Sequence, residues 1–147
     1  MIQGLNIPQY EHQFQKVAEK LYIYDIIRKK YILLSPEEWV RQQFIRWLIE
    51  EHQYSKNLMQ VERGHHYQSR QKRTDLVVYD RLGMPLMLVE CKAMDITISE
   101  KTLQQAAIYN KTLQAKYVTV TNGLCYAVCL VNDGKLVFLE QIPSIEQ

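Results

Sequence analysis

The sequence predicts an α/β fold of the α+β type, in which a mixed β-sheet is flanked by helices. Two segments have the apolar periodicity of an amphipathic helix, and the segments between and after them are short apolar runs that end at turn residues. A helix that separates two strands permits a parallel crossover in an otherwise antiparallel sheet. The expected helices span 35–52 and 99–114, and the expected strands lie at 57–64, 74–80, 85–92 and within 116–140.

The first helix has a clear N-terminal signature. Ser35 is a good N-cap, Pro36 suits the first helical position, and Glu38 stands where a capping box needs an acid. At 100° per residue, Glu37 falls near the middle of the apolar arc. We therefore expect Glu38 to cap the helix and Glu37 to point inward without a local role.

The second half of the chain alternates helix, strand and turn signals. Ser99 is a plausible N-cap for the second helix. Three strands are expected within 116–140, separated by the tight turns Asn122-Gly123 and Asn132-Asp133-Gly134. The element order from residue 35 onward is αβββαβ.

The chain is short enough to be one globular domain. At 147 residues it can bury a self-sufficient core. We expect this domain to span 35–147, with 1–34 an N-terminal extension packed on the core. Within the extension, residues 10–20 are expected to include a short helical stretch and 21–27 to form a strand or an extended arm.

Composition indicates a cytoplasmic protein. No apolar run approaches the roughly 20 residues of a membrane span, and the N-terminus lacks the basic-then-apolar order of a signal peptide. Three cysteines do not suggest a disulfide framework. Cys125 and Cys129 lie in a strand-like run without companion ligands, so core packing is favoured over a zinc site.

A pair of carboxylates and a lysine form the candidate site. A hairpin turn centred between Leu82 and Gly83 places Asp75 directly opposite Glu90, with Cβ atoms about 4.5–5.5 Å apart. Two carboxylates this close repel unless a cation lies between them, and such oxygen ligands suit Mg²⁺. Lys92, one pleat beyond Glu90, can orient a water or stabilise a phosphoryl transition state. The pattern predicts a hydrolytic phosphodiester site.

The alternative is an ordinary cross-strand salt bridge from Lys92 to Asp75 or Glu90. Three features favour the functional interpretation: the flanking strand residues are apolar, the register opposes the two acids, and Glu37 arrives from a helix without a structural partner.

A basic stretch precedes the strand that carries Asp75. Residues 63–73 contain no acid, and they include Arg63, Arg70, Lys72 and Arg73. Such a stretch is usually a solvated loop. Because it lies immediately before the strand of Asp75, a surface that faces phosphate is the alternative interpretation.

Five motifs occur in order from Ser35 to Gly123: PEEWVRQ, RTDLVVYD, LVECKA, LQQAAIYN and AKYVTVTNG. On these motifs the chain resembles the PD-(D/E)xK nuclease superfamily, and most closely the N-terminal nuclease domain of type I restriction enzyme R subunits. The resemblance implies a restriction-endonuclease-like core and DNA as the substrate.

The resemblance also implies roles for individual residues. Asp75 and Glu90 match the acids that hold a divalent metal, Mg²⁺ or in its place Mn²⁺. The backbone carbonyl of Cys91 matches a usual third protein ligand. Lys92 matches the lysine that positions or activates the attacking water.

Two helices supply further matches. In the family, the acid of the first helix lies four residues before an arginine. Here that arginine is Arg41, so the matching acid is Glu37, and Glu38 is the alternative. Gln105 and Tyr109 match a QxxxY motif that family members use near the metal and the DNA backbone. Without the neighbouring motifs, these two residues would be ordinary helix-surface positions.

The chain also departs from type I R subunits. It contains no GxxxxGK[ST] motif and no motor segment, and Thr74 replaces the proline of PD. We expect a Mg²⁺-dependent nuclease, endonuclease or exonuclease, that works without a motor domain and uses no ATP. Its expected partners are DNA and either a second copy of the chain or partner protein subunits. The alternatives are a catalytically weak nucleic-acid-binding subunit of a larger restriction or repair assembly and, less favoured, a non-nuclease scaffold.

Overall fold

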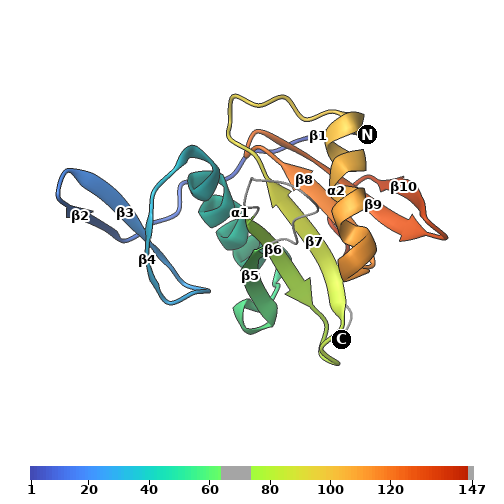
Figure 1. Cartoon of the computed structure of the whole chain (residues 1–147), viewed down its shortest axis with the longest axis horizontal. Coiled ribbons are helices and arrows are strands. Elements are labelled where there is room, and N and C mark those ends of the chain that lie inside the picture. Colours follow the sequence, from blue (N-terminus) through green and yellow to red (C-terminus); the bar gives the residue numbers. More distant parts are fainter. Residues whose placement is uncertain (64–73, 146–147) are drawn as a thin grey trace.

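The computed structural model describes residues 1–63 and 74–145. Its centre is a seven-stranded sheet with the order β1-β9-β8-β7-β6-β5, and β10 pairs with β9 beside this path. The mixed sheet and the αβββαβ order from residue 35 onward are confirmed (Figure 1). The strands are β1 (Gln3–Gly4), β5 (Met59–Arg63), β6 (Thr74–Tyr79), β7 (Pro85–Cys91), β8 (Tyr117–Thr121), β9 (Cys125–Asn132) and β10 (Lys135–Leu139).

Two helices cover opposite faces of this sheet. Helix α1 (Pro36–His52) packs its Phe44 and Leu48 against one face, together with Val89 of β7. Helix α2 (Glu100–Leu113) packs Leu103 and Ala106 against the other face, on β8 and β9. Alternation along each strand therefore divides the sheet residues between an α1 face and an α2 face.

Helix α2 makes the parallel crossover that the element order predicts. Strands β7 and β8 run parallel, with Met87 opposite Tyr117 and Glu90 opposite Val120. The remaining neighbours in the central sheet are antiparallel. Since α2 leads back to the start of β8, its N-terminal half lies at the Cys91 end of β7.

The N-terminal segment contains strands where the sequence predicted a short helix. Strands β2 (Phe14–Val17), β3 (Lys20–Asp25) and β4 (Lys30–Leu33) form an antiparallel sheet. The helix expected within 10–20 is wrong, because Ala18 and Glu19 adopt positive φ and close a hairpin between β2 and β3. The strand expected at 21–27 is confirmed as far as Asp25.

Parts of this N-terminal segment contact the central core. The side chains of Leu5, Ile7, Tyr10, Ile26 and Ile27 pack against the apolar cluster beneath α1. No helix within the described residues has the length and apolar character to cross a membrane.

The two expected N-caps are present. Ser35 Oγ accepts the Glu38 N–H at 3.1 Å, and Ser99 and Thr102 form a capping box at the start of α2. The capping box expected at α1 is wrong, because the Glu38 side chain turns into the protein instead of back to the Ser35 backbone.

Candidate active site

The β6–β7 hairpin has the register that the turn position predicts. Leu76 lies opposite Val89 and Val77 opposite Leu88, and one more step of this register brings Asp75 opposite Glu90. The register shifts only near the turn, at Tyr79. The structure therefore brings the two predicted carboxylates onto neighbouring positions of adjacent strands.

Both carboxylates lie on the α2 face of the sheet. Val77 and Leu88, which flank them along the strands, pack together with Ala115 just after α2, whereas Leu76, Val89 and Cys91 pack on the α1 side. Asp75 is 4% exposed and Glu90 6%. Burying two carboxylates costs free energy unless charged or polar partners compensate for it.

Lys92 supplies a positive charge directly at this pair. Its Nζ lies 2.8 Å from Glu90 Oε2, and its backbone N–H donates to Thr121 O at 2.8 Å. About a third of the Lys92 side chain is exposed, against 8% for Glu90. The lysine thus neutralises one carboxylate from the open side of the site.

Cys91 lies between the two charged residues but points to the other face. The pKa of its thiol is raised to about 12, chiefly by burial; the charge of Arg41 acts to lower it, and the charges of Asp75, Glu38 and Glu90 act to raise it. The four charges therefore lie within electrostatic range of one buried atom. A thiol that stays protonated is a poor nucleophile, so the side chain packs in the core and only the backbone carbonyl remains a candidate ligand.

Thiol accessibility provides a direct check of this arrangement. The three cysteines form no disulfide, and Cys91 and Cys129 are buried while Cys125 is half-buried. With a disulfide reagent at pH 8, Cys125 should react first in the native protein, and the other two should react at the rate of unfolding. A Cys125→Ser variant that still labels quickly would contradict the buried placement of Cys91 and Cys129.

A third acid, Glu62, extends the row of carboxylates. It lies opposite Asp75 on β5, and its Oε2 accepts the hydroxyl of Tyr79 at 2.6 Å. Burial and this hydrogen bond raise the pKa of Tyr79 to about 12. The sequence analysis missed Glu62 because the register of β5 depends on pairing across a long connection, and no short turn sets it.

The inward-pointing glutamate of α1 is Glu38, so the orientation expected for Glu37 is wrong. Glu37 is exposed, whereas Glu38 is 5% exposed. The two Glu38 oxygens accept hydrogen bonds from Arg41 Nη1 at 2.8 Å, Arg28 Nη2 at 2.7 Å and Gln42 Nε2 at 3.0 Å. Arg28 also pairs with the buried Asp25. This network, made by Asp25, Arg28, Glu38, Arg41 and Gln42, is called the α1 network below.

The QxxxY residues lie beside the buried stripe of α2. Gln105 is exposed and Tyr109 is half-buried, while Ala106 between them is fully buried. Their i, i+4 spacing puts both on one side of the helix. Gln105 belongs to the N-terminal half of α2, which is the half at the Cys91 end of β7.

Asn122 holds the loop that follows Lys92. Its Nδ2 donates to Ile96 O at 2.7 Å, and its Oδ1 accepts the N–H groups of Leu124 at 2.9 Å and Cys125 at 3.0 Å. The sequence identified Asn122 only as a turn residue. Its link to Ile96 follows from the parallel pairing of β7 and β8, which brings the two strand ends together.

The basic stretch lies largely outside the described residues. Arg70, Lys72 and Arg73 belong to 64–73, which the structure does not describe. Arg63 ends β5, where it lies opposite Thr74. Its one described residue, Arg63, therefore lies on the strand next to that of Asp75, and contact of the basic stretch with phosphate stays a prediction.

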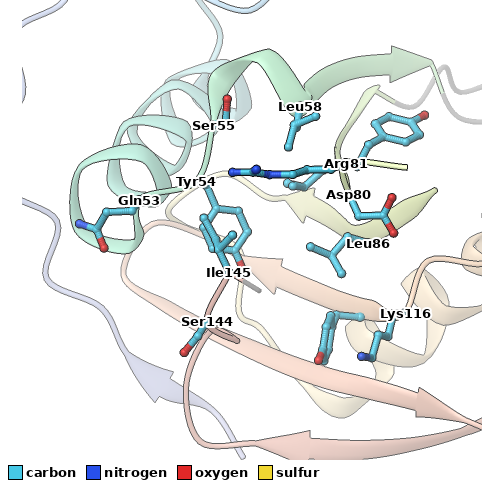
Figure 2. A pocket seen from close by; sticks show the side chains of 13 residues that line it. Gln53, Tyr54, Ser55, Leu58, Asp80, Arg81, Leu86, Lys116, Ser144 and Ile145 are labelled. Carbon is cyan, nitrogen blue, oxygen red and sulfur yellow. The ribbon is translucent and has the colours of Figure 1, made fainter. Parts of the chain in front are cut away.

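A cavity of about 220 Å³ lies at the other end of β6. Tyr54, Arg81 and Leu86 are among the side chains that line it (Figure 2). Asp80, also in the lining, is five positions from Asp75, or roughly 17 Å along a strand. The cavity is thus separate from the carboxylate pair.

The donor set at Asp75 and Glu90 fits a hard, weakly held cation. Within 1–63 and 74–145, no group of three or more His, Cys, Asp or Glu side chains is placed to hold a metal ion. Mg²⁺ commonly uses one or two carboxylates and completes its shell with waters and substrate phosphate oxygens. The pair and the Cys91 carbonyl match that mode of binding.

Comparison with known proteins assigns the family. The family model described as type I restriction enzyme R protein N terminus matches residues 36–143, from the start of α1 to beyond β10. No curated protein matches the chain. The match covers the carboxylate pair, Lys92 and both helices. The chain therefore belongs to the family of type I restriction enzyme R protein N termini, which gives it a nuclease-related role.

Proposed function

We propose that the chain is a PD-(D/E)xK nuclease that hydrolyses phosphodiester bonds in DNA with Mg²⁺, or Mn²⁺ in its place. One observation carries the proposal. Two buried carboxylates, Asp75 and Glu90, are brought side by side on one sheet face, with Lys92 Nζ 2.8 Å from Glu90. Purely structural packing does not require two acids in neighbouring positions of an apolar hairpin.

Each residue of this group has a distinct task in the proposed reaction. Asp75, Glu90 and the Cys91 carbonyl would hold the metal, which supplies Lewis-acid stabilisation of the developing phosphoryl charge and lowers the pKa of a bound water. Lys92 would orient the attacking water and offset negative charge in the transition state. Its partly exposed side chain can reach an incoming phosphate while its stem stays against the strand.

Further residues would position the DNA. Gln105 and Tyr109 present polar groups from α2 at the edge of its buried stripe. Arg63, Arg70, Lys72 and Arg73 would contact phosphates next to the strand that carries Asp75. Glu38 replaces Glu37 as the buried acid of α1 that would assist the reaction; its charge raises the pKa of the Cys91 thiol, next to Glu90 in the chain.

A catalytically weak DNA-binding subunit of a larger assembly is the second candidate. The observation that favours it is the Lys92–Glu90 ion pair. Lys92 contacts a Glu90 oxygen that would have to bind the metal, so this contact competes with metal binding. In this case the chain would bind DNA but would not cleave it.

A cleavage assay separates the two candidates. Wild-type protein with Mg²⁺ or Mn²⁺ should cut DNA, and Lys92→Ala should lower the rate about 100- to 1000-fold, the usual cost of removing one transition-state contact. Lys101→Ala, which removes an exposed lysine of α2, is the matched control and should cut normally. Binding without cleavage by the wild type would select the second candidate, and full activity of Lys92→Ala would exclude the proposed chemistry.

A further inference from the structure

The small N-terminal sheet lies outside the family match and has an aromatic outer face. Strands β2, β3 and β4 all precede residue 36, where the match begins. Ile23, in the middle of β3, is fully buried. Because side chains alternate along a strand, Tyr22 and Tyr24 point to the face opposite Ile23. Figure 1 shows this sheet projecting beside α1.

Neighbouring strands extend that face. Tyr31 of β4 lies opposite Tyr24, and Leu33 lies opposite Tyr22. Tyr22 and Tyr24 are half-buried, while Tyr31 is 38% exposed and Leu33 48%. The Tyr24 and Tyr31 rings meet edge to face, with centroids 5.2 Å apart. We call the surface formed by Tyr22, Tyr24, Tyr31 and Leu33 the tyrosine face.

The sheet that carries the tyrosine face is fixed to α1. Arg28 lies in the turn between β3 and β4 and forms ion pairs with the buried Asp25 and with Glu38 of α1. Its Nη2 lies 2.7 Å from Glu38 Oε2. On the inner side, Phe14 and His12 pack against the Trp39 ring, with centroids 6.3 and 5.3 Å away. The tyrosines are therefore held in place before any ligand arrives, which lowers the entropy cost of binding.

The charges around the tyrosine face favour a polyanionic ligand. Lys20, which shares the face of Tyr22 and Tyr24, and Lys29, in the turn between β3 and β4, are both exposed. Of the two acids of this sheet and its turns, Asp25 is buried in the α1 network and Glu19 pairs with Lys16 at 3.8 Å. The whole chain carries only +2. Protein–protein interfaces are depleted in lysine, whereas aromatic side chains combined with cations are typical of single-strand binding surfaces. The other two exposed lysines, Lys16 and Lys30, lie opposite Leu21 and Asp25 and are therefore on the other face of the sheet.

We propose that the tyrosine face binds single-stranded DNA. Unpaired bases would stack on the tyrosine rings, and phosphates would lie along Lys20 and Lys29 at the edges of the sheet. A duplex hides its base faces and would engage only the lysines. The inference rests on the proposed function for the choice of DNA, and it adds a substrate-binding surface apart from the carboxylate pair.

The test is a fluorescence anisotropy titration of a labelled oligothymidylate in EDTA with the full chain. Tyr31→Ala should weaken binding about 5- to 150-fold, the range for loss of one base–aromatic stack. Tyr31→Phe keeps the ring and should bind like the wild type. Leu21→Ala is the matched control, because Leu21 is 44% exposed on the opposite face of the same sheet, and it should also bind normally.

Salt dependence separates stacking from phosphate contact. Lys29→Gln should flatten the log–log salt slope by about 0.7, the value for one single-strand phosphate contact. Tyr31→Ala should lower affinity without changing the slope. Lys29 lies in a turn and its side chain is exposed, so this variant keeps the proposal testable if Tyr31→Ala does not fold.

Several outcomes would overturn the inference: no binding by the wild type, equal or tighter binding of duplex DNA, or a Tyr31→Ala affinity equal to that of Leu21→Ala. The result is independent of catalysis. In EDTA the binding measurement needs neither the metal nor cleavage, and cleavage is measured separately with Mg²⁺ on the same tyrosine variants. If Tyr31→Ala binds like the wild type and the wild type cleaves DNA, only this inference is rejected. If Tyr31→Ala binds weakly and the wild type does not cleave DNA, only the proposed reaction is rejected.

Discussion

Replacing Asp75 by Asn should abolish metal-dependent cleavage and metal binding together. The amide is isosteric with the carboxylate and keeps the packing at a site that is 4% exposed, but it removes one of the two negative ligands. We expect a fall in cleavage rate of at least about 100-fold. The expected readouts are the cleavage rate and a calorimetric titration with Mn²⁺.

Stability measurements provide a readout that does not depend on turnover. A ligand that binds only the folded state stabilises it by about 2.7 kcal/mol at 100 times its Kd. Mn²⁺ should therefore raise the melting temperature of the wild type and leave that of Asp75→Asn unchanged. Asp133→Asn, at an exposed hairpin turn, is the control and should behave like the wild type. A metal-induced rise in Asp75→Asn would mean that the metal binds elsewhere.

Replacing Glu38 by Ala should destabilise the protein by about 3–5 kcal/mol, the usual cost of removing one member of a buried ion pair. Glu38 accepts from two arginines, and Arg41 is 4% exposed. Its removal takes a carboxylate partner away from the guanidinium groups of both Arg28 and Arg41. For a domain with a total stability of roughly 5–15 kcal/mol, this is a large fraction. Urea denaturation at neutral pH measures it.

Glu37→Ala is the matched control for the α1 network. Glu37 is the adjacent residue in the same helical turn, and it is exposed. Its replacement should change the unfolding free energy by less than about 0.5 kcal/mol. Equal losses for the two variants would mean that the α1 network adds nothing beyond helix propensity. A greater loss for Glu37→Ala would reverse the assignment of the inward acid.

The local signals in the sequence were sufficient for most of the fold. Ser35 and Ser99 mark helix starts because an N-cap acts within one turn, on N–H groups that otherwise have no partner. The opposition of Asp75 and Glu90 was predictable because a short hairpin turn sets the register of both strands. These features depend on residues close together in the chain.

The α1 acid was not predictable in the same way. On a helical wheel Glu37 falls near the middle of the apolar arc and Glu38 lies 100° away, nearer its edge, so the wheel favours the wrong residue. What selects Glu38 is Arg28, which approaches from the turn between β3 and β4 and holds one of its oxygens. A helical wheel contains no information about that partner. The N-terminal hairpin was missed for a related reason, because Ala18 and Glu19 adopt positive φ without a glycine or asparagine to signal it.

By itself the sequence determined the element order from residue 35 onward, the two N-cap serines, the register of the β6–β7 hairpin and the carboxylate–lysine group of Asp75, Glu90 and Lys92. The tertiary structure alone decided that Glu38 is the buried acid of α1, that Glu62 joins the row beside Asp75, and that Asn122 holds the loop after Lys92. The physical reason is range: caps and turns satisfy backbone groups a few residues away, whereas the burial of a charge depends on whichever partner the folded chain brings to it.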